Sequence, residues 1–259
     1  MAGCPGGSAA GNFHGVGARN RQADRPVRRV ERDPAAEWDA KAWWARIPAV
    51  RALLDQGLDL PAGVTFLVGE NGSGKSTLVE ALAEAYGLNA EGGSRGAMHR
   101  TRRTESPLGE VLRLVRAPGG RGNAYFLRAE TTHGLYTYLE GLDDSPDVDL
   151  HDRSHGEGFL ALLERKFAHP GFYLLDEPEA ALSFTSTLSL MSRLSALTEA
   201  GAQIVVATHS PILTALPGAT VLELGEHGIR AVTWSELAVV DHFRAFLERP
   251  EMYLRHLLS

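Results

Sequence analysis

Three short apolar runs in the chain have the pattern of buried strands. They are VTFLV at 64–68, FYLLD at 172–176 and QIVVATHS at 203–210, and all three are rich in β-branched, aromatic or leucine residues. Strands covered on both faces of a parallel sheet show such continuous apolar runs. The pattern therefore predicts a parallel sheet built from at least these runs.

Helical periodicity separates the apolar runs. Apolar residues recur at helical spacing from 78 to 86, and the pattern stops at Gly87. Similar spacing follows at 159–168 and at about 180–200. Strands that alternate with helices indicate an α/β fold.

The remaining segments suggest one domain with additions. Residues 1–25 are Gly-, Ala- and Arg-rich, and we expect a disordered tail before a single domain at 26–259. Within it, 88–150 reads as an insertion of strands and loops, and 235–259 as C-terminal helices broken at Pro250.

Composition narrows the classes of function. The 259 residues carry a net charge of −6 and one cysteine, which excludes an intramolecular disulfide. No apolar run approaches the length of a transmembrane helix, and we expect a cytoplasmic protein. The overall acidity disfavours broad binding of nucleic acid.

One segment departs from this acidity. Residues 95–128 hold eight arginines, among them Arg100, Arg102 and Arg103, against two acidic residues. The segment is either a local DNA-binding face or a solvated loop.

The sequence GENGSGKST at 69–77 matches the phosphate-binding pattern GxxxxGK[ST] between a predicted strand and a predicted helix. Its glycines let the backbone curl so that N–H groups face phosphate oxygens. Lys75 would add a cation, and Ser76 a hydroxyl ligand for Mg²⁺. The alternative is a chance glycine-rich turn. The residues expected to bind a nucleotide here are Gly69, Asn71, Gly72, Ser73, Gly74, Lys75, Ser76 and Thr77.

Polar residues end the other two buried strands. Asp176 would be costly at the end of such a strand unless it met a cation, which suggests a Mg²⁺ ligand. Glu177 would then act on the attacking water as a general base, and His209 would contact the γ-phosphate and hold that carboxylate. The alternatives are two carboxylates that cap the next helix and a structural histidine. With Lys75, these two residues form the predicted catalytic set.

Together, GENGSGKST, FYLLDE, EAALS and ATHS resemble the Walker A, Walker B, D-loop and switch-histidine motifs of ATP-binding cassette (ABC) ATPases. The resemblance covers about residues 60–225 and is strongest to small stand-alone bacterial AAA/ABC ATPases near the SMC, RecF and overcoming-lysogenization branch. It implies a P-loop fold of three layers with a β-rich edge and a reduced inserted subdomain.

The family signature LSGGQ aligns with Arg153–Glu157. The resemblance implies that Ser154 and Gly156 bind the γ-phosphate held by a second subunit. Ser154 with Glu157 is also an ordinary capping box.

Two other family positions are less well matched. The chain has no glutamine between Gln56 and Gln203, so Glu130 is the nearest candidate for the Q-loop metal ligand, unless it is a surface glutamate. Trp43 or Trp44 would stack the adenine or pack against the core.

The resemblance thus implies an ATP- and Mg²⁺-dependent ATPase that closes as a homodimer and drives a conformational change in a soluble partner or on DNA. The alternative is the energising subunit of a membrane transporter. The missing glutamine and the altered signature count against that alternative.

Overall fold

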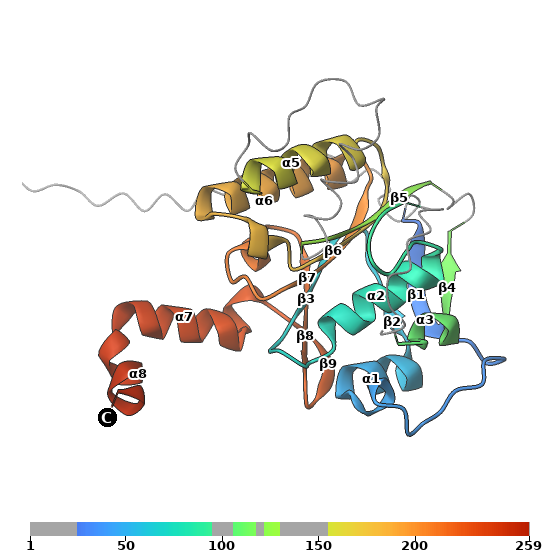
Figure 1. The fold of residues 1–259 in the computed structure, drawn as a ribbon, viewed down its shortest axis with the longest axis horizontal. Helices are drawn as coiled ribbons and strands as arrows, with labels where there is room; N and C mark the ends of the chain where they lie inside the picture. The colour runs from blue at the N-terminus through green and yellow to red at the C-terminus, as the bar shows by residue number, and fades with distance from the viewer. Residues whose placement is uncertain (1–24, 95–105, 118–121, 130–154, 259) are drawn as a thin grey trace, which may run out of the picture.

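The computed structural model describes residues 25–94, 106–117, 122–129 and 155–258 (Figure 1). A six-stranded sheet with the order β5-β6-β7-β3-β8-β9 forms its centre. All neighbouring pairs are parallel except β8 and β9, which form an antiparallel hairpin. In sheet order, the strands are Asn123–Arg128, Gly171–Asp176, Gln203–Thr208, Gly63–Val68, Thr220–Gly225 and Gly228–Val232. The predicted α/β fold with a parallel sheet is confirmed.

Every residue of β6 and β7 is buried, as their apolar runs predict. Successive side chains of a strand point to opposite faces of the sheet. Leu174 of β6 and Val205 of β7 therefore belong to one hydrophobic cluster, whereas Leu175 and Val206 belong to a second. The sheet is the middle one of three layers.

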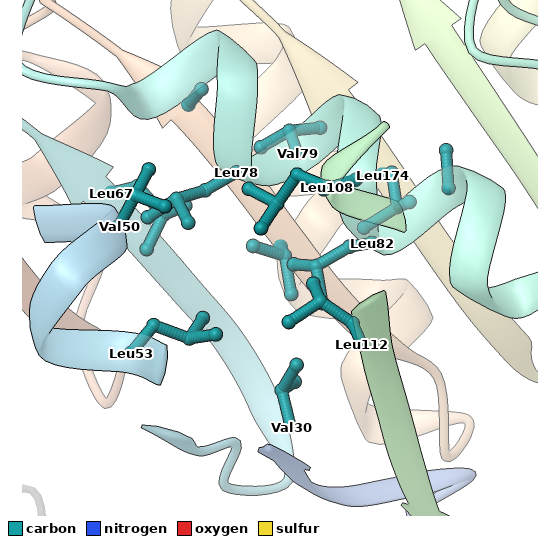
Figure 2. Close-up of a cluster of buried hydrophobic side chains, with 14 of the residues drawn as sticks. Val30, Val50, Leu53, Leu67, Leu78, Val79, Leu82, Leu108, Leu112 and Leu174 are labelled. Carbon is teal, nitrogen blue, oxygen red and sulfur yellow. The ribbon is translucent and has the colours of Figure 1, made fainter. Parts of the chain in front are cut away.

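Helices α1, α2 and α3 supply the first cluster, and α5 and α6 supply the second (Figures 1 and 2). In Figure 2, Leu78, Val79 and Leu82 of α2 meet Leu67 of β3 and Leu174 of β6. These helices are Pro48–Gln56, Lys75–Tyr86, Leu108–Val111, His155–Lys166 and Phe184–Glu199. The left-handed Gly87 ends α2, as predicted.

The predicted helix at about 180–200 begins at Phe184. Ser183 caps it, because its hydroxyl oxygen accepts the N–H of Ser186 at 3.2 Å. A separate 3₁₀ helix, η2 (Pro178–Ala181), comes before the cap. Two further 3₁₀ turns are η1 (Trp44–Arg46) and η3 (Leu213–Ala215).

A second, antiparallel sheet has the order β2-β1-β4, with strands Leu58–Asp59, Val27–Arg32 and Leu112–Arg116. In its described parts, the segment 88–150 supplies β4 to this sheet and β5 to the central one. Both strands pair with distant parts of the chain, which local periodicity does not reveal.

The C-terminal part comprises η4 (Trp234–Glu236), α7 (Ala238–Glu248) and α8 (Pro250–Leu257). Pro250 starts α8 at its first position, as expected from the missing N–H. Both helices extend away from the three layers (Figure 1). None of the helices in the described part of the chain is long and apolar enough to cross a membrane.

Gln203 joins the two sheets. Its side-chain oxygen accepts the N–H of Val27 at 2.9 Å, and its amide nitrogen lies 2.8, 3.1 and 3.0 Å from the carbonyl oxygens of Val27, Leu60 and Pro61. The side chain is buried at the start of β7. One amide therefore satisfies backbone groups that burial would otherwise leave without partners.

We expect Gln203→Leu to lower the free energy of unfolding by roughly 2 to 4 kcal/mol, because it leaves buried backbone N–H and C=O groups unpaired. Urea denaturation measures this loss. Gln56→Leu at the exposed end of α1 is the control, with a change within about 0.5 kcal/mol. An equal, small effect of both substitutions would contradict the assigned role.

Candidate functional site

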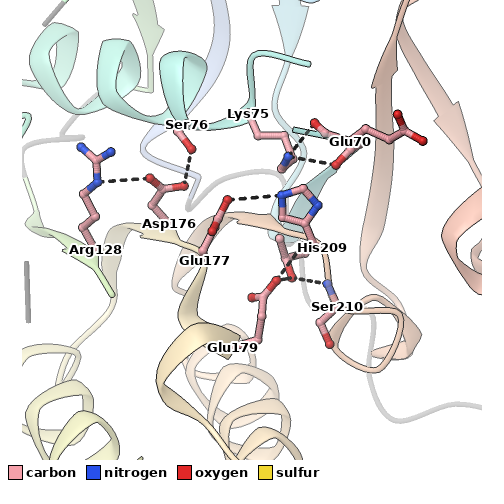
Figure 3. Close-up of polar contacts among 11 residues, drawn as sticks. Glu70, Lys75, Ser76, Arg128, Asp176, Glu177, Glu179, His209 and Ser210 are labelled. Carbon is pink, nitrogen blue, oxygen red and sulfur yellow. Dashed lines mark hydrogen bonds and ion pairs between the residues drawn. The ribbon is translucent and has the colours of Figure 1, made fainter. Parts of the chain in front are cut away.

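The carboxyl ends of β3, β6 and β7 meet at one edge of the central sheet. Val68 is in register with Thr208, and Asp176 with Ala207. The residues that follow these strands, Gly69, Glu177 and His209, therefore lie together, and Figure 3 shows Glu177 beside His209 at this edge. Polar groups gather at this edge because the chain leaves the buried strands there.

The loop between β3 and α2 has the geometry of an anion cradle. Gly72 and Gly74 have φ of +81° and +98°, in the region that favours glycine. A Cβ at Gly74 would lie 2.7 Å from Cγ2 of Ile47. A Cβ at Gly69 would lie 2.4 Å from the carbonyl oxygen of Leu224. A side chain is therefore disfavoured by backbone conformation at Gly72, by lack of space at Gly69, and by both at Gly74.

Lys75 closes this loop from inside. Its ammonium donates to the carbonyl oxygens of Gly69 at 2.9 Å and Glu70 at 3.1 Å (Figure 3). An ammonium group has three N–H donors, so these two bonds leave one for a phosphate oxygen. The hydroxyl of Ser73 is buried, and no described residue gives it a hydrogen bond. Both groups fit a loop that receives an anion.

Burial lowers the pKa of Lys75, while the carboxylates of Glu177, Asp176 and Glu179 oppose that shift by favouring the charged ammonium. The same burial strengthens the attraction of the ammonium for an anion, because less water screens it.

Asp176, at the end of β6, accepts a hydrogen bond from the Ser76 hydroxyl at 3.0 Å. Nε of Arg128 lies 3.5 Å from its other oxygen, and the Arg128 guanidinium also pairs with Glu80 at 2.6 Å. Burial raises the pKa of Asp176 to about 6, although Arg128 and the Ser76 bond lower it and the Glu177 and Glu80 carboxylates raise it. The contacts of Asp176 thus compensate only part of the cost of burying its charge. A carboxylate in such a place gains strongly from a bound metal ion.

Glu177 has an unusual backbone. Among the described residues it is the only non-glycine residue with positive φ, at φ 47° and ψ 50°. Such conformations cost about 1 kcal/mol or more and are often found at functional sites. The Glu177 side chain points toward His209, whose Nε2 lies 3.3 Å from its Oε1 but makes no hydrogen bond to it (Figure 3).

These residues fit a nucleotide with Mg²⁺. The described part of the chain holds no group of three or more His, Cys, Asp or Glu side chains placed for a metal ion. Mg²⁺ bound to a nucleotide commonly takes one or two protein oxygens together with phosphate oxygens and water. Ser76 and Asp176, 3.0 Å apart, would supply the protein ligands.

The structure brings together Gly69 to Thr77, Asp176, Glu177 and His209, the predicted set on the three strand ends. Glu130 and Ser154 lie outside the described residues. Gly156 is in the first turn of α5, which begins at His155.

Of the two tryptophans considered for adenine stacking, Trp44 is buried with its ring 5.7 Å from that of Trp38. It is therefore a core residue and not available to a base. Trp43 is 60% exposed, so the structure leaves it free to contact a ligand.

Sequence reasoning missed Arg128 as a site residue and grouped it with the basic segment. The described arginines of that segment have internal partners, since Arg113 pairs with Glu31 and the Arg116 guanidinium lies 4.4 Å from the Tyr86 ring centre. Arg128 reaches Asp176 because β5 and β6 pair in register at these two residues. A strong signal for that pairing is absent from the local sequence.

Two family models match the parts of the chain that carry this site. A family model described as "AAA domain" matches residues 46–111, which include the glycine-rich loop. A model described as "AAA domain, putative AbiEii toxin, Type IV TA system" matches residues 158–215, which include Asp176 and His209.

Curated relatives share this region. The Cytochrome c biogenesis ATP-binding export protein CcmA of Rhodospirillum rubrum is 32% identical over 185 residues, covering 63% of this chain and 75% of the relative. The Zinc import ATP-binding protein ZnuC of Halorhodospira halophila is 30% identical over 194 residues, covering 71% of each chain.

The Ribose import ATP-binding protein RbsA 1 of Rhizobium meliloti is 29% identical over 185 residues, 62% of this chain. The chain spans only 37% of that relative's length. A solved structure titled "An inward-facing conformation of a putative metal-chelate type ABC transporter" is 17% identical with a TM-score of 0.49, covering 86% of this chain and 89% of the other.

The raised pKa of Asp176 predicts that the free energy of unfolding depends on pH. The ordinary pKa is 3.8 and the folded value about 6, so the folded state keeps a proton that the unfolded state releases. Stability therefore falls as pH rises from about 4 to 6, and the loss persists above 6.

We expect Asp176→Asn to be more stable than the parent without Mg²⁺ at pH 7.5, on the order of 2 to 3 kcal/mol, and equally stable near pH 4. Urea denaturation at both pH values measures the gain. Asp55→Asn, at an exposed position of α1, is the control, with a change below about 0.5 kcal/mol. A gain of the same size at pH 4 would contradict the titration of Asp176 as its source.

Proposed function

The chain belongs to the ATP-binding cassette (ABC) family of P-loop ATPases, and from that membership we propose that it binds and hydrolyses ATP as a homodimer. The observation that carries the proposal is the convergence of Lys75, Ser76, Asp176, Glu177 and His209 at one edge of the sheet. This arrangement supports phosphoryl transfer from a nucleotide to water.

In this mechanism the protein positions ATP and stabilises charge. Lys75 and the N–H groups at the start of α2 would hold the phosphate oxygens, and Ser76 and Asp176 would hold Mg²⁺. Mg²⁺, when bound, would neutralise charge on the β- and γ-phosphates.

Glu177 orients the attacking water and accepts its proton, and His209 holds the Glu177 carboxylate and contacts the γ-phosphate. Water attack on phosphorus breaks the bond to the bridging oxygen, giving ADP and phosphate. The protein forms no covalent bond to the nucleotide.

We propose that a second copy completes each site through Ser154, which lies outside the described residues, and Gly156, which lies in the first turn of α5. The start of a helix presents free N–H groups, which favour an anion there. Two chains would then close head to tail around two nucleotides, and hydrolysis would reopen the dimer. The output is a conformational cycle, which would drive a soluble partner protein.

Glu177→Gln should bind ATP but lose turnover by about 100-fold or more, because the amide cannot accept a proton from water. It should also accumulate as a dimer with ATP and Mg²⁺ on a sizing column. Glu164→Gln on an exposed part of α5 is the control and keeps parental turnover. A Glu177→Gln protein that stays monomeric with bound ATP would rule out the dimeric site.

A transporter role has specific support, because the relatives include proteins named for ribose import and zinc import. In such a role a separate membrane protein would receive the conformational change. The chain has no glutamine between Gln56 and Gln203 and so lacks the usual coupling residue, which counts against a transporter role. Copurification with a membrane protein encoded beside this chain would favour that role over the soluble one.

DNA is the third candidate partner, and it depends on Arg100, Arg102 and Arg103, which lie outside the described residues. Net charge and the internal partners of the described arginines lead us to expect no salt-sensitive binding of duplex DNA. Fluorescence anisotropy of labelled duplex DNA at about 50 mM and 300 mM salt measures the affinity. Binding that disappears when all three arginines become glutamine would instead make DNA the partner.

A further inference from the structure

Glu179 lies in η2, two residues after Glu177, and its carboxylate crosses to the end of β7 (Figure 3). Its Oε1 accepts the Thr208 hydroxyl at 2.7 Å and the backbone N–H of His209 at 2.6 Å. Both donors belong to the segment that presents the His209 ring.

Thr208 extends this contact into a chain of hydrogen bonds. Its side chain is fully buried, and its hydroxyl oxygen also accepts the N–H of Ser210 at 2.9 Å. The carboxylate of Glu179 thus bonds to the His209 N–H directly and is linked to the Ser210 N–H through the Thr208 hydroxyl. Because hydrogen bonds to a charged acceptor are stronger than neutral ones, this contact is stiff as well as short.

A second link joins the same two segments. The N–H of Glu177 donates to the carbonyl oxygen of Ala207 at 2.9 Å. Glu177 and Glu179 are therefore both attached to the end of β7, one through its backbone and one through its side chain. The separation between Glu177 and His209 follows from these two attachments.

The cost of placing Glu179 here argues against a role in packing alone. Its other oxygen, Oε2, is buried, and no described residue donates a hydrogen bond to it. A buried carboxylate oxygen without a donor is unfavourable. Among the described residues, the two hydrogen bonds at Oε1 offset part of the cost of burying this carboxylate, and both go to the His209 segment.

We propose that Glu179 is a positioning residue, which holds the backbone of His209 so that the imidazole faces the Glu177 carboxylate 3.3 Å away. This inference rests on the proposed ATP hydrolysis and deepens it. Glu179 acts through His209, because both hydrogen bonds at its Oε1 go to the Thr208–His209 segment.

A double-mutant cycle in the full chain tests the inference, with ATP turnover measured for Glu179→Ala, His209→Ala and the double variant. We expect Glu179→Ala to lower kcat roughly 10- to 100-fold, with KM for ATP within about threefold, because a displaced group near the reacting atoms slows chemistry more than binding. In the His209→Ala background, Glu179→Ala should cause no further loss.

Glu236 provides a matched control. Its carboxylate accepts the backbone N–H and the hydroxyl of Thr233, both at 2.7 Å, and so makes the same pair of bonds outside the site. Glu236→Ala should leave kcat unchanged. Glu179→Gln keeps a carbonyl oxygen for the His209 N–H, and we expect it to recover most of the turnover.

Multiplicative losses in the double variant would overturn the inference, and so would unchanged kcat in Glu179→Ala. If Glu179→Ala is unfolded at the assay temperature, Glu179→Gln takes its place in the cycle, and its smaller loss must likewise vanish beside His209→Ala. Parental protein with no more turnover than Glu177→Gln would overturn the proposed function and this inference with it. Parental turnover with independent losses would overturn the inference alone.

Discussion

The register of three parallel strands is the constraint on which the site depends. β3, β7 and β6 are adjacent, and each ends at the same edge of the sheet. The phosphate loop, Glu177 and His209 therefore meet without any long-range loop to bring them together. A shift of one residue in any of these strands would turn its buried side chains to the opposite face. Packing of the apolar core therefore fixes the strand register, and the register fixes the positions of the polar residues at this edge.

Charge at this edge is balanced locally. Asp176 meets Ser76 and Arg128, Lys75 meets two backbone carbonyls, and Glu179 meets a hydroxyl and an N–H. Each contact offsets part of the cost of burial. At Asp176 the cost of burial still outweighs the contacts with Ser76 and Arg128 and raises its pKa to about 6, so a metal ion at this carboxylate would offset a remaining cost.

Local sequence was sufficient for the central strands and the loop, because buried parallel strands are continuously apolar and glycines mark the cradle. It predicted neither the partner of β5 nor that of β4, since pairing between distant segments leaves no local periodicity. Arg128 and Glu179 were missed for the same reason. Their partners, Asp176 and His209, become neighbours only after the sheet forms.

Gln203 attaches the small sheet to the strand that leads to the catalytic edge. The residue occupies the start of β7, while His209 follows the end of the same strand. Its hydrogen bonds fasten the small sheet to the central one at the side opposite the phosphate loop. The strand that starts at this attachment ends beside the phosphate loop, so β7 alone connects the anchor of the small sheet to the segment that presents the His209 ring.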